Sequence, residues 1–106
     1  MFNEGTIIAL STPQGAGAIG ILRLSGSQAL EIVSLHFKAK NGILLTSIAS
    51  HQTTLGIFHD NGQVIDEVLV TPFIAPRSYT GETVVEISCH GSPFILQRIM
   101  ELCIQK

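Results

Sequence analysis

Two charged side chains stand out because each interrupts an otherwise apolar segment. Arg23 lies within residues 20–24 (GILRL) and Glu86 lies within residues 84–87 (VVEI). Burying an unpaired charge is costly, so each side chain needs a partner or a route to water. One interpretation is that the two charges pair with each other or extend to solvent. The other is a polar ligand pocket, in which the carboxylate accepts hydrogen bonds from an aminopyrimidine edge and the guanidinium clamps a carboxylate.

A second group of reactive side chains, Cys89 and His90, lies where a predicted strand meets the start of a predicted helix. Such a position lowers a thiol pKa and favours anions. A Cys-His catalytic pair is disfavoured because neighbouring side chains in an extended segment point to opposite sides. We interpret His90 as a ligand-contacting or capping side chain.

The remaining acidic and metal-binding candidates predict no site. Asp66 and Glu67 follow a predicted hairpin and are interpreted as a solvated face, with paired acid catalysis as the alternative. The histidines lack the spacing of metal ligands and no C-x-x-C motif occurs, so no metal site is predicted. No catalytic residue is assigned.

Residues 15–20 (GAGAIG) match the pattern G-x-G-x-x-G. A dinucleotide site requires these glycines to open a helix, whereas residues 19–24 alternate like a strand. We therefore favour a glycine-rich turn that lets backbones pack closely, and a strand after the glycines would exclude dinucleotide binding. No G-x-x-x-x-G-K-[ST] occurs, which excludes nucleoside triphosphate binding of the P-loop type by this chain.

The elements that must position these residues follow from periodicity and turn chemistry. The order β-β-α-β-β-β-α predicts an α+β fold, with a mixed or antiparallel sheet and two helices on one face. The predicted strands are residues 6–10, 18–25, 53–59, 64–73 and 83–89; the helices run from residues 25–27 to about 38 and from 92–93 onward.

Local signals set the boundaries of the first helix. Ser25 or Ser27 is expected to cap it, and Leu30, Val33 and Phe37 share one of its faces. No pattern is found in residues 38–52, which we predict to be a loop.

Turn and cap signals also mark the later elements. Residues 60–62 (DNG) predict a hairpin with a type I′ turn, and Pro72 limits its strand to an edge or an end. Ser92 and Pro93 are expected to start the second helix. Its apolar stripe comprises Ile95, Ile99 and Leu102.

Composition narrows the class of protein. The 106 residues form one domain or a piece of a longer protein, with 45% hydrophobic and only 13% charged residues. This excludes intrinsic disorder and indicates that part of the surface is normally covered. Only 6 Lys and Arg, with a net charge of −2, argue against a freestanding nucleic-acid binder. With neither a signal peptide nor a membrane-spanning run, and with Cys89 and Cys103 read as reduced thiols, we expect a cytoplasmic protein.

Several stretches together resemble the N-terminal domain of the MnmE (TrmE) tRNA-modification GTPases, in order and over nearly the whole chain. The most specific is PRSYTGETVVEI at residues 76–87, followed by CHG at residues 89–91. The others are residues 6–13, 17–26 and 64–70.

The resemblance implies that residues 1–106 are the N-terminal, folate-binding and dimerising domain of a longer GTPase. Its fold would be similar to the tetrahydrofolate-binding domain of the glycine-cleavage aminomethyltransferase. Family members are homodimers that act with a flavoprotein partner, MnmG (GidA), on the wobble uridine of tRNAs. A formyl or methylene tetrahydrofolate supplies the carbon. The full complex contacts the tRNA, and GTP, magnesium and potassium bind outside this chain, which alone lacks GTPase motifs.

The resemblance also assigns site residues. The family's folate-binding arginine falls on Arg23 and its folate-binding glutamate on Glu86, the same two charges that interrupt apolar segments here. His90 is a further candidate. A binding lysine and a catalytic cysteine of the family fall beyond residue 106. The family's P-P-G-R-G is PQGAG at residues 13–17, and its H-G-G is HGS at residues 90–92. The alternative function is an interaction module that self-associates without folate.

Overall fold

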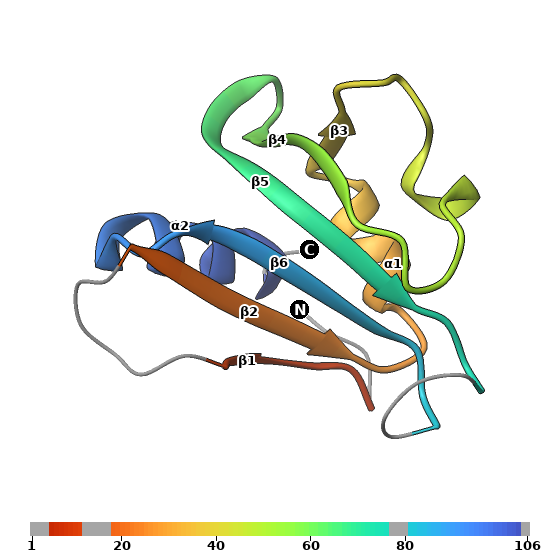
Figure 1. The fold of residues 1–106 in the computed structure, drawn as a ribbon. Coiled ribbons are helices and arrows are strands. Elements are labelled where there is room, and N and C mark those ends of the chain that lie inside the picture. Colours follow the sequence, from red (N-terminus) through yellow and green to blue (C-terminus); the bar gives the residue numbers. More distant parts are fainter. Residues whose placement is uncertain (1–4, 12–17, 77–80, 105–106) are drawn as a thin grey trace.

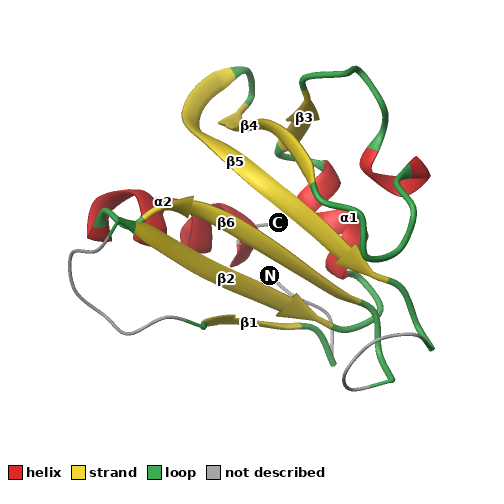
Figure 2. Cartoon of the chain, viewed as in Figure 1, coloured by secondary structure: helices red, strands yellow, loops and turns green. Residues whose placement is uncertain are grey.

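One antiparallel sheet organises the computed structural model, which describes residues 5–11, 18–76 and 81–104 (Figure 1). The strands lie in the order β1-β2-β6-β5-β4-β3, and every neighbouring pair is antiparallel. The strands are β1 (Ile7–Leu10), β2 (Ile19–Ser25), β3 (Phe37–Ala39), β4 (Thr54–Asp60), β5 (Gln63–Phe73) and β6 (Val84–His90). The helices are α1 (Ala29–Ser34), a 3₁₀ turn η1 (Leu45–Ser47) and α2 (Pro93–Ile104). The predicted α+β class with two α-helices is confirmed (Figure 2).

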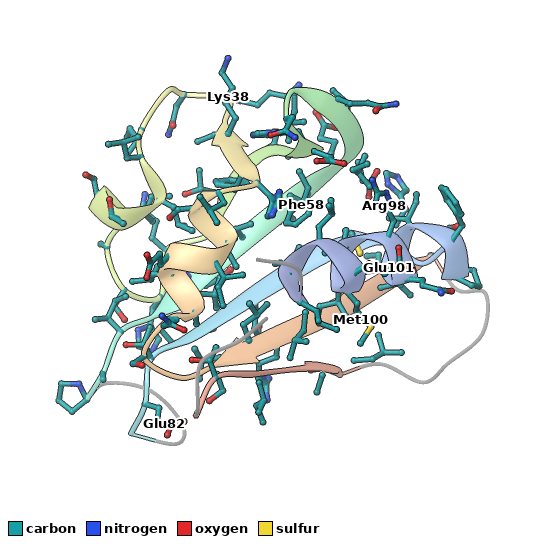
Figure 3. All side chains as sticks on the ribbon, turned by 180° about the vertical axis from the view of Figure 1, so that it is seen from behind. Lys38, Phe58, Glu82, Arg98, Met100 and Glu101 are labelled. Carbon is teal, nitrogen blue, oxygen red and sulfur yellow. The ribbon has the colours of Figure 1, made fainter. Side chains whose placement is uncertain are left out.

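Both α-helices cover the same face of the sheet, as Figure 3 shows from behind. Strand β2 explains why, because its side chains alternate. Leu22 and Leu24 are fully buried toward the helices, while Arg23 between them points to the other face. The strand-like alternation predicted for residues 19–24 is confirmed.

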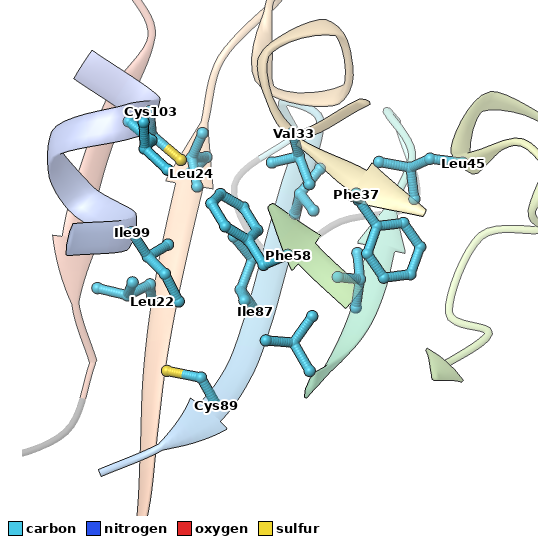
Figure 4. Close-up of a cluster of buried hydrophobic side chains, with 14 of the residues drawn as sticks. Leu22, Leu24, Val33, Phe37, Leu45, Phe58, Ile87, Cys89, Ile99 and Cys103 are labelled. Atoms are coloured by element: carbon cyan, nitrogen blue, oxygen red, sulfur yellow. The ribbon is translucent and has the colours of Figure 1, made fainter. Parts of the chain in front are cut away.

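The core lies between this face and the helices (Figure 4). Phe58 of β4, Ile87 of β6, Val33 of α1 and Ile99 of α2 are all 0% exposed. Burying such a side chain contributes about 1.5–3 kcal/mol. These contacts hold the central strands in place and leave the other sheet face free to carry polar residues.

The start of α1 differs from the prediction. Its N-cap is Gln28, without a capping hydrogen bond from a side chain, so neither Ser25 nor Ser27 caps the helix. Instead, the Gln28 backbone N–H donates to Oγ1 of Thr6 at 3.2 Å. Thr6, which is distant in sequence, therefore accepts a hydrogen bond at the helix start, where the local pattern predicted a serine cap.

The helix also ends earlier than predicted, at Ser34. Phe37, expected on the helical face, lies in the short strand β3, where it pairs with Phe58 of β4. Residues 38–52 are likewise not a plain loop, because they contain part of β3 and the 3₁₀ turn. Leu45 and Ile48 from this segment are buried in the core. Pairing at the sheet edge overrides the local helical spacing.

The hairpin and the second helix form as predicted. Asn61 and Gly62 both have positive φ, 50° and 91°, as a type I′ turn between β4 and β5 requires. Pro72 is the last residue but one of β5. At the start of α2, the Ile95 N–H donates to Oγ of Ser92 at 3.4 Å. Ile99 and Leu102 are buried, and Ile95 packs against the core.

Candidate functional site

The sheet face opposite the helices carries apolar side chains that the described elements leave exposed. They include Ile7 of β1, Ile19 of β2, Leu55 of β4 and Leu69 of β5, with exposed fractions of 63%, 61%, 43% and 42%. We call this surface the open face. Both charges singled out from the sequence, and the larger part of a cavity, lie on it.

Arg23 and Glu86 meet at the centre of the open face. They are register partners on β2 and β6. Nε of Arg23 donates to Oε2 of Glu86 at 3.0 Å, and Nη2 donates to the same oxygen. The side chains are 42% and 24% exposed. The two side chains therefore pair with each other, as the first of the two interpretations of these charges has it.

The row of residues around this ion pair is polar on one side. Thr71 of β5 is the register partner of Glu86, and its hydroxyl lies 2.7 Å from that of Thr53. On the other side, Ala9 of β1 is opposite Arg23 and is small. A guanidinium and a carboxylate are thus presented side by side to solvent, where each can bind an opposite charge or a complementary polar edge.

A cavity of about 250 Å³ opens next to this row. The ladder between β5 and β6 begins at the pair Leu69 and Ser88, and before Leu69 the two strands separate. The cavity lies at this separation, and Ser88 on its wall is two residues from Glu86 on the same strand face. Its lining residues are Ala18, Ile19, Leu55, Glu67, Val68, Leu69, Ser88, Cys89 and His90.

Asp66 and His90 bridge the separated strands. Oδ2 of Asp66 accepts the His90 backbone N–H at 2.9 Å, and Oδ1 lies 2.8 Å from Nδ1 of the ring. Asp66 is only 9% exposed, so the prediction of a solvated face is wrong for this residue. It holds for Glu67, which is half exposed and pairs with Lys40 at 2.6 Å. His90 does not cap α2, since Ser92 does.

Neither cysteine is activated. Burial and, secondarily, the nearby Asp66 charge raise the pKa of the Cys89 thiol to about 11. Burial alone raises the pKa of Cys103 to about 12. The position of Cys89 near a helix start was expected to lower its pKa, and this expectation is wrong because the thiol faces the apolar core. Both thiols are free, as predicted.

The glycine motif does not open a helix. Residues 15–17 lie outside the described residues, but its last members, Ile19 and Gly20, belong to strand β2. A dinucleotide site of the Rossmann type is therefore excluded. A Cβ at Gly20 would lie 2.6 Å from Cδ2 of Leu96, so the glycine allows α2 to approach the sheet closely.

No group of three or more His, Cys, Asp or Glu side chains among the described residues lies close enough to hold a metal ion. No described helix is both long and apolar enough to cross a membrane.

The sequence singled out Arg23, Glu86 and His90, but it indicated neither the burial of Asp66 nor the cavity. No pattern separated Asp66 from Glu67, because each has apolar residues two positions before and after it: Val64 and Val68 for Asp66, Ile65 and Leu69 for Glu67. The cavity had no signal either, since it arises where two strands stop pairing.

Fold and site together define a small α+β domain whose sheet has one face packed by helices and one face carrying an ion pair and a cavity. Residues 6–106 match the family model described as the GTP-binding protein TrmE N-terminus. The chain belongs to this family.

Relatives agree with this assignment. The chain is 55% identical to the tRNA modification GTPase MnmE of Christiangramia forsetii, over 95% of this chain and 21% of that protein. It is 48% identical to the protein of the same name from Flavobacterium johnsoniae, over 100% of this chain and 23% of the relative. The MnmE of Cytophaga hutchinsonii is 48% identical over 95% of this chain and 21% of its own length. The chain thus spans about a fifth of the length of these curated relatives.

Proposed function

We propose that this chain is the folate-binding, homodimerising N-terminal domain of a GTPase that modifies the wobble uridine of tRNAs. Arg23 and Glu86 would hold a formyl or methylene tetrahydrofolate, which supplies the carbon of an aminomethyl or carboxymethylaminomethyl group. The whole protein would act in the cytoplasm with the flavoprotein MnmG, and GTP, magnesium and potassium would bind outside this chain. The names of the relatives support this proposal.

The Arg23–Glu86 pair carries the proposal. A tetrahydrofolate has an aminopyrimidine edge rich in N–H donors at one end and carboxylates at the other. A glutamate accepts hydrogen bonds from the N–H donors of the aminopyrimidine edge, and an arginine beside it donates to the ring carbonyl oxygen that adjoins them. The two side chains that this ligand needs are adjacent and partly exposed on the open face. A fold like that of the tetrahydrofolate-binding domain of aminomethyltransferase belongs to the same proposal.

The apolar open face supports dimerisation. Ile7, Ile19, Leu55 and Leu69 expose large apolar surfaces on one side of the sheet. Large exposed apolar side chains on one face of a sheet are typical of interfaces. A second copy covering this face would also explain why only 13% of the residues are charged. The contact with MnmG and tRNA would then be made by the assembled protein.

The test is calorimetric titration with 5-formyltetrahydrofolate. We expect saturable binding by the wild type that is lost in the double variant Arg23→Ala, Glu86→Ala. A matched control is the double variant Arg98→Ala, Asp60→Ala. It removes another guanidinium–carboxylate pair, at 2.7 Å between α2 and the hairpin and far from Arg23 in sequence. If the control loses binding equally, the effect is not specific to the open face.

A second candidate function is an interaction module without folate. The observation favouring it is that Arg23 and Glu86 pair with each other. A folded dimer that binds no folate, in a natural full-length protein that retains whatever follows residue 106, would select this alternative.

A further inference from the structure

Asp66 and His90 form a second polar pair on the molecule, separate from the Arg23–Glu86 ion pair that carries the proposed function. Both carboxylate oxygens of Asp66 are occupied by one residue, through the backbone N–H and ring Nδ1 of His90. Asp66 is 9% exposed, whereas the His90 side chain is 69% exposed. A buried carboxylate therefore fixes both the backbone and the ring of an exposed histidine at the cavity rim.

This contact determines the protonation of the ring. A carboxylate only accepts hydrogen bonds, so Nδ1 of His90 must carry the proton that lies on Oδ1 of Asp66. In a neutral imidazole, the second nitrogen Nε2 is then an acceptor. The pair presents one defined acceptor at the rim of the cavity.

We propose that Asp66 is a positioning residue that holds His90 in the Nδ1–H form, so that Nε2 accepts a ring N–H of a ligand in the cavity between β5 and β6. The proposal rests on the folate-binding function, because the reduced pterin is a ring system rich in N–H donors. Ile19, Leu55 and Leu69 supply apolar walls for such a ring.

The position of the cavity links it to the ion pair. Ser88 on the cavity wall and Glu86 lie on the same face of β6, two residues apart. Glu86 and His90 are four residues apart on this same face, a span of about 13 Å along the strand. A ligand of that length can therefore reach both the Glu86 carboxylate and Nε2 of His90. Both are acceptors, so each takes an N–H donor from a different part of the ligand.

Asp66→Asn tests the positioning role without changing the shape of the side chain. The His90 backbone N–H can only donate, so it retains the carbonyl oxygen of the new amide. The amide NH₂ then faces Nδ1, which must accept, and the ring proton moves to Nε2. A carboxylate-to-amide change that inverts a histidine tautomer is known from the serine protease triad.

Long-range ¹⁵N NMR of the histidine-labelled chain measures this inversion. The spectrum is recorded at a pH about two units above the ordinary histidine pKa of about 6.5. The protein contains its own references. Nδ1 of His36 must donate to the carbonyl oxygen of His59 at 3.0 Å, and Nδ1 of His59 accepts the Gly62 N–H at 3.1 Å. We expect His90 to match His36 in the wild type and His59 in Asp66→Asn. A wild-type His90 in the Nε2–H form overturns the proposal.

The ligand arm uses 5-formyltetrahydrofolate and the natural full-length protein. Loss of one well-placed hydrogen bond weakens binding by about tenfold, which we expect for Asp66→Asn. His90→Asn should weaken binding similarly while its unfolding temperature stays near that of the wild type, because its amide replaces the Nδ1–H donor but not Nε2. The control is His51→Asn, which lies at φ 71°, where asparagine is tolerated.

The outcomes separate the two proposals. Wild-type binding that both Asp66→Asn and His90→Asn leave unchanged overturns the role of the pair and leaves the folate function intact. A wild-type protein that binds no folate overturns the folate function and with it this ligand, while the tautomer spectrum still decides whether Asp66 positions His90.

Discussion

The two faces of the sheet differ in what their side chains do. On the helix-covered face, Phe58 and Ile87 are 0% exposed and packed against α1 and α2. On the open face, Leu55 of β4 and its register partner Leu69 of β5 remain more than 40% exposed. They lie beside an ion pair and a cavity. The apolar side chains of the helix-covered face are buried within the chain, whereas those of the open face remain partly exposed.

This difference indicates how stability and binding are divided. Substitutions on the helix-covered face remove buried contacts and are expected to unfold the protein. Substitutions on the open face remove little that the isolated chain uses, so their effects should appear in binding or association. Four predictions, ordered by their expected effect on stability, test this division.

The largest effect is expected for Phe58→Ala compared with Leu55→Ala on the same strand. Phe58 is fully buried, and truncating such a side chain costs about 3–5 kcal/mol. Leu55 is 43% exposed, so its truncation should cost well under half of that. Urea unfolding of both variants measures the two free energies. Equal losses would mean that the open face is part of the folding core.

Asp66→Ala compared with Glu67→Ala tests the next largest difference, between adjacent residues on opposite faces of β5. Asp66 is buried and accepts two hydrogen bonds, so its loss should cost about 1–3 kcal/mol. Glu67 makes an exposed ion pair with Lys40, which contributes about 0–1 kcal/mol. Thermal unfolding at neutral pH would reveal the difference. A larger loss for Glu67→Ala would contradict the buried position of Asp66.

Arg23→Ala and Glu86→Ala should change stability little, by about as much as Glu67→Ala. The pair is partly exposed, and such pairs contribute about 0–1 kcal/mol after solvent screening. Under the proposed function, the same variants should weaken folate binding by at least about tenfold. Chemical denaturation and titration on one set of samples compare the two effects. Variants that unfold the chain would show that this pair is a structural clamp.

Much of the division between faces could be predicted from the sequence. The alternation in β2 separated Leu22 and Leu24 from Arg23, because a strand has a period of two. The charges Arg23 and Glu86 were conspicuous because their neighbours are apolar. The sequence could not predict that Arg23 and Glu86 are direct register partners, because the two residues are 63 positions apart.

Other errors have an equally specific cause. Leu30, Val33 and Phe37 fit a helical face, and only the pairing of Phe37 with β4 makes it a strand residue. Residue spacing alone cannot predict pairing with a strand that follows later in the chain. For Asp66 the parity of the strand was uninformative, because Glu67 has equally apolar residues two positions away, and charge was taken as evidence of exposure. The cavity depends on where β5 and β6 stop pairing, which is a property of the folded sheet.

The smallest effect on stability at neutral pH is expected from the two buried thiols. Their pKa values in the folded protein are raised to about 11 for Cys89 and about 12 for Cys103, from an ordinary value of 9.0. Below about pH 9 both states keep the thiols neutral, so stability does not depend on them. As pH rises from 9 toward 11 and 12, the unfolded chain releases protons that the folded chain retains, and stability falls.

Alkylation by iodoacetamide at pH 8 provides a sensitive measurement of the same property. A rise of two pKa units lowers the thiolate fraction of Cys89 about a hundredfold, so the folded protein should react far more slowly than the protein in urea. Mass spectrometry resolves the two sites. Because Cys89 also lines the cavity, fast modification there with Cys103 protected would mean that the cavity opens to the core. The two faces would then not be separate at this point of the sheet.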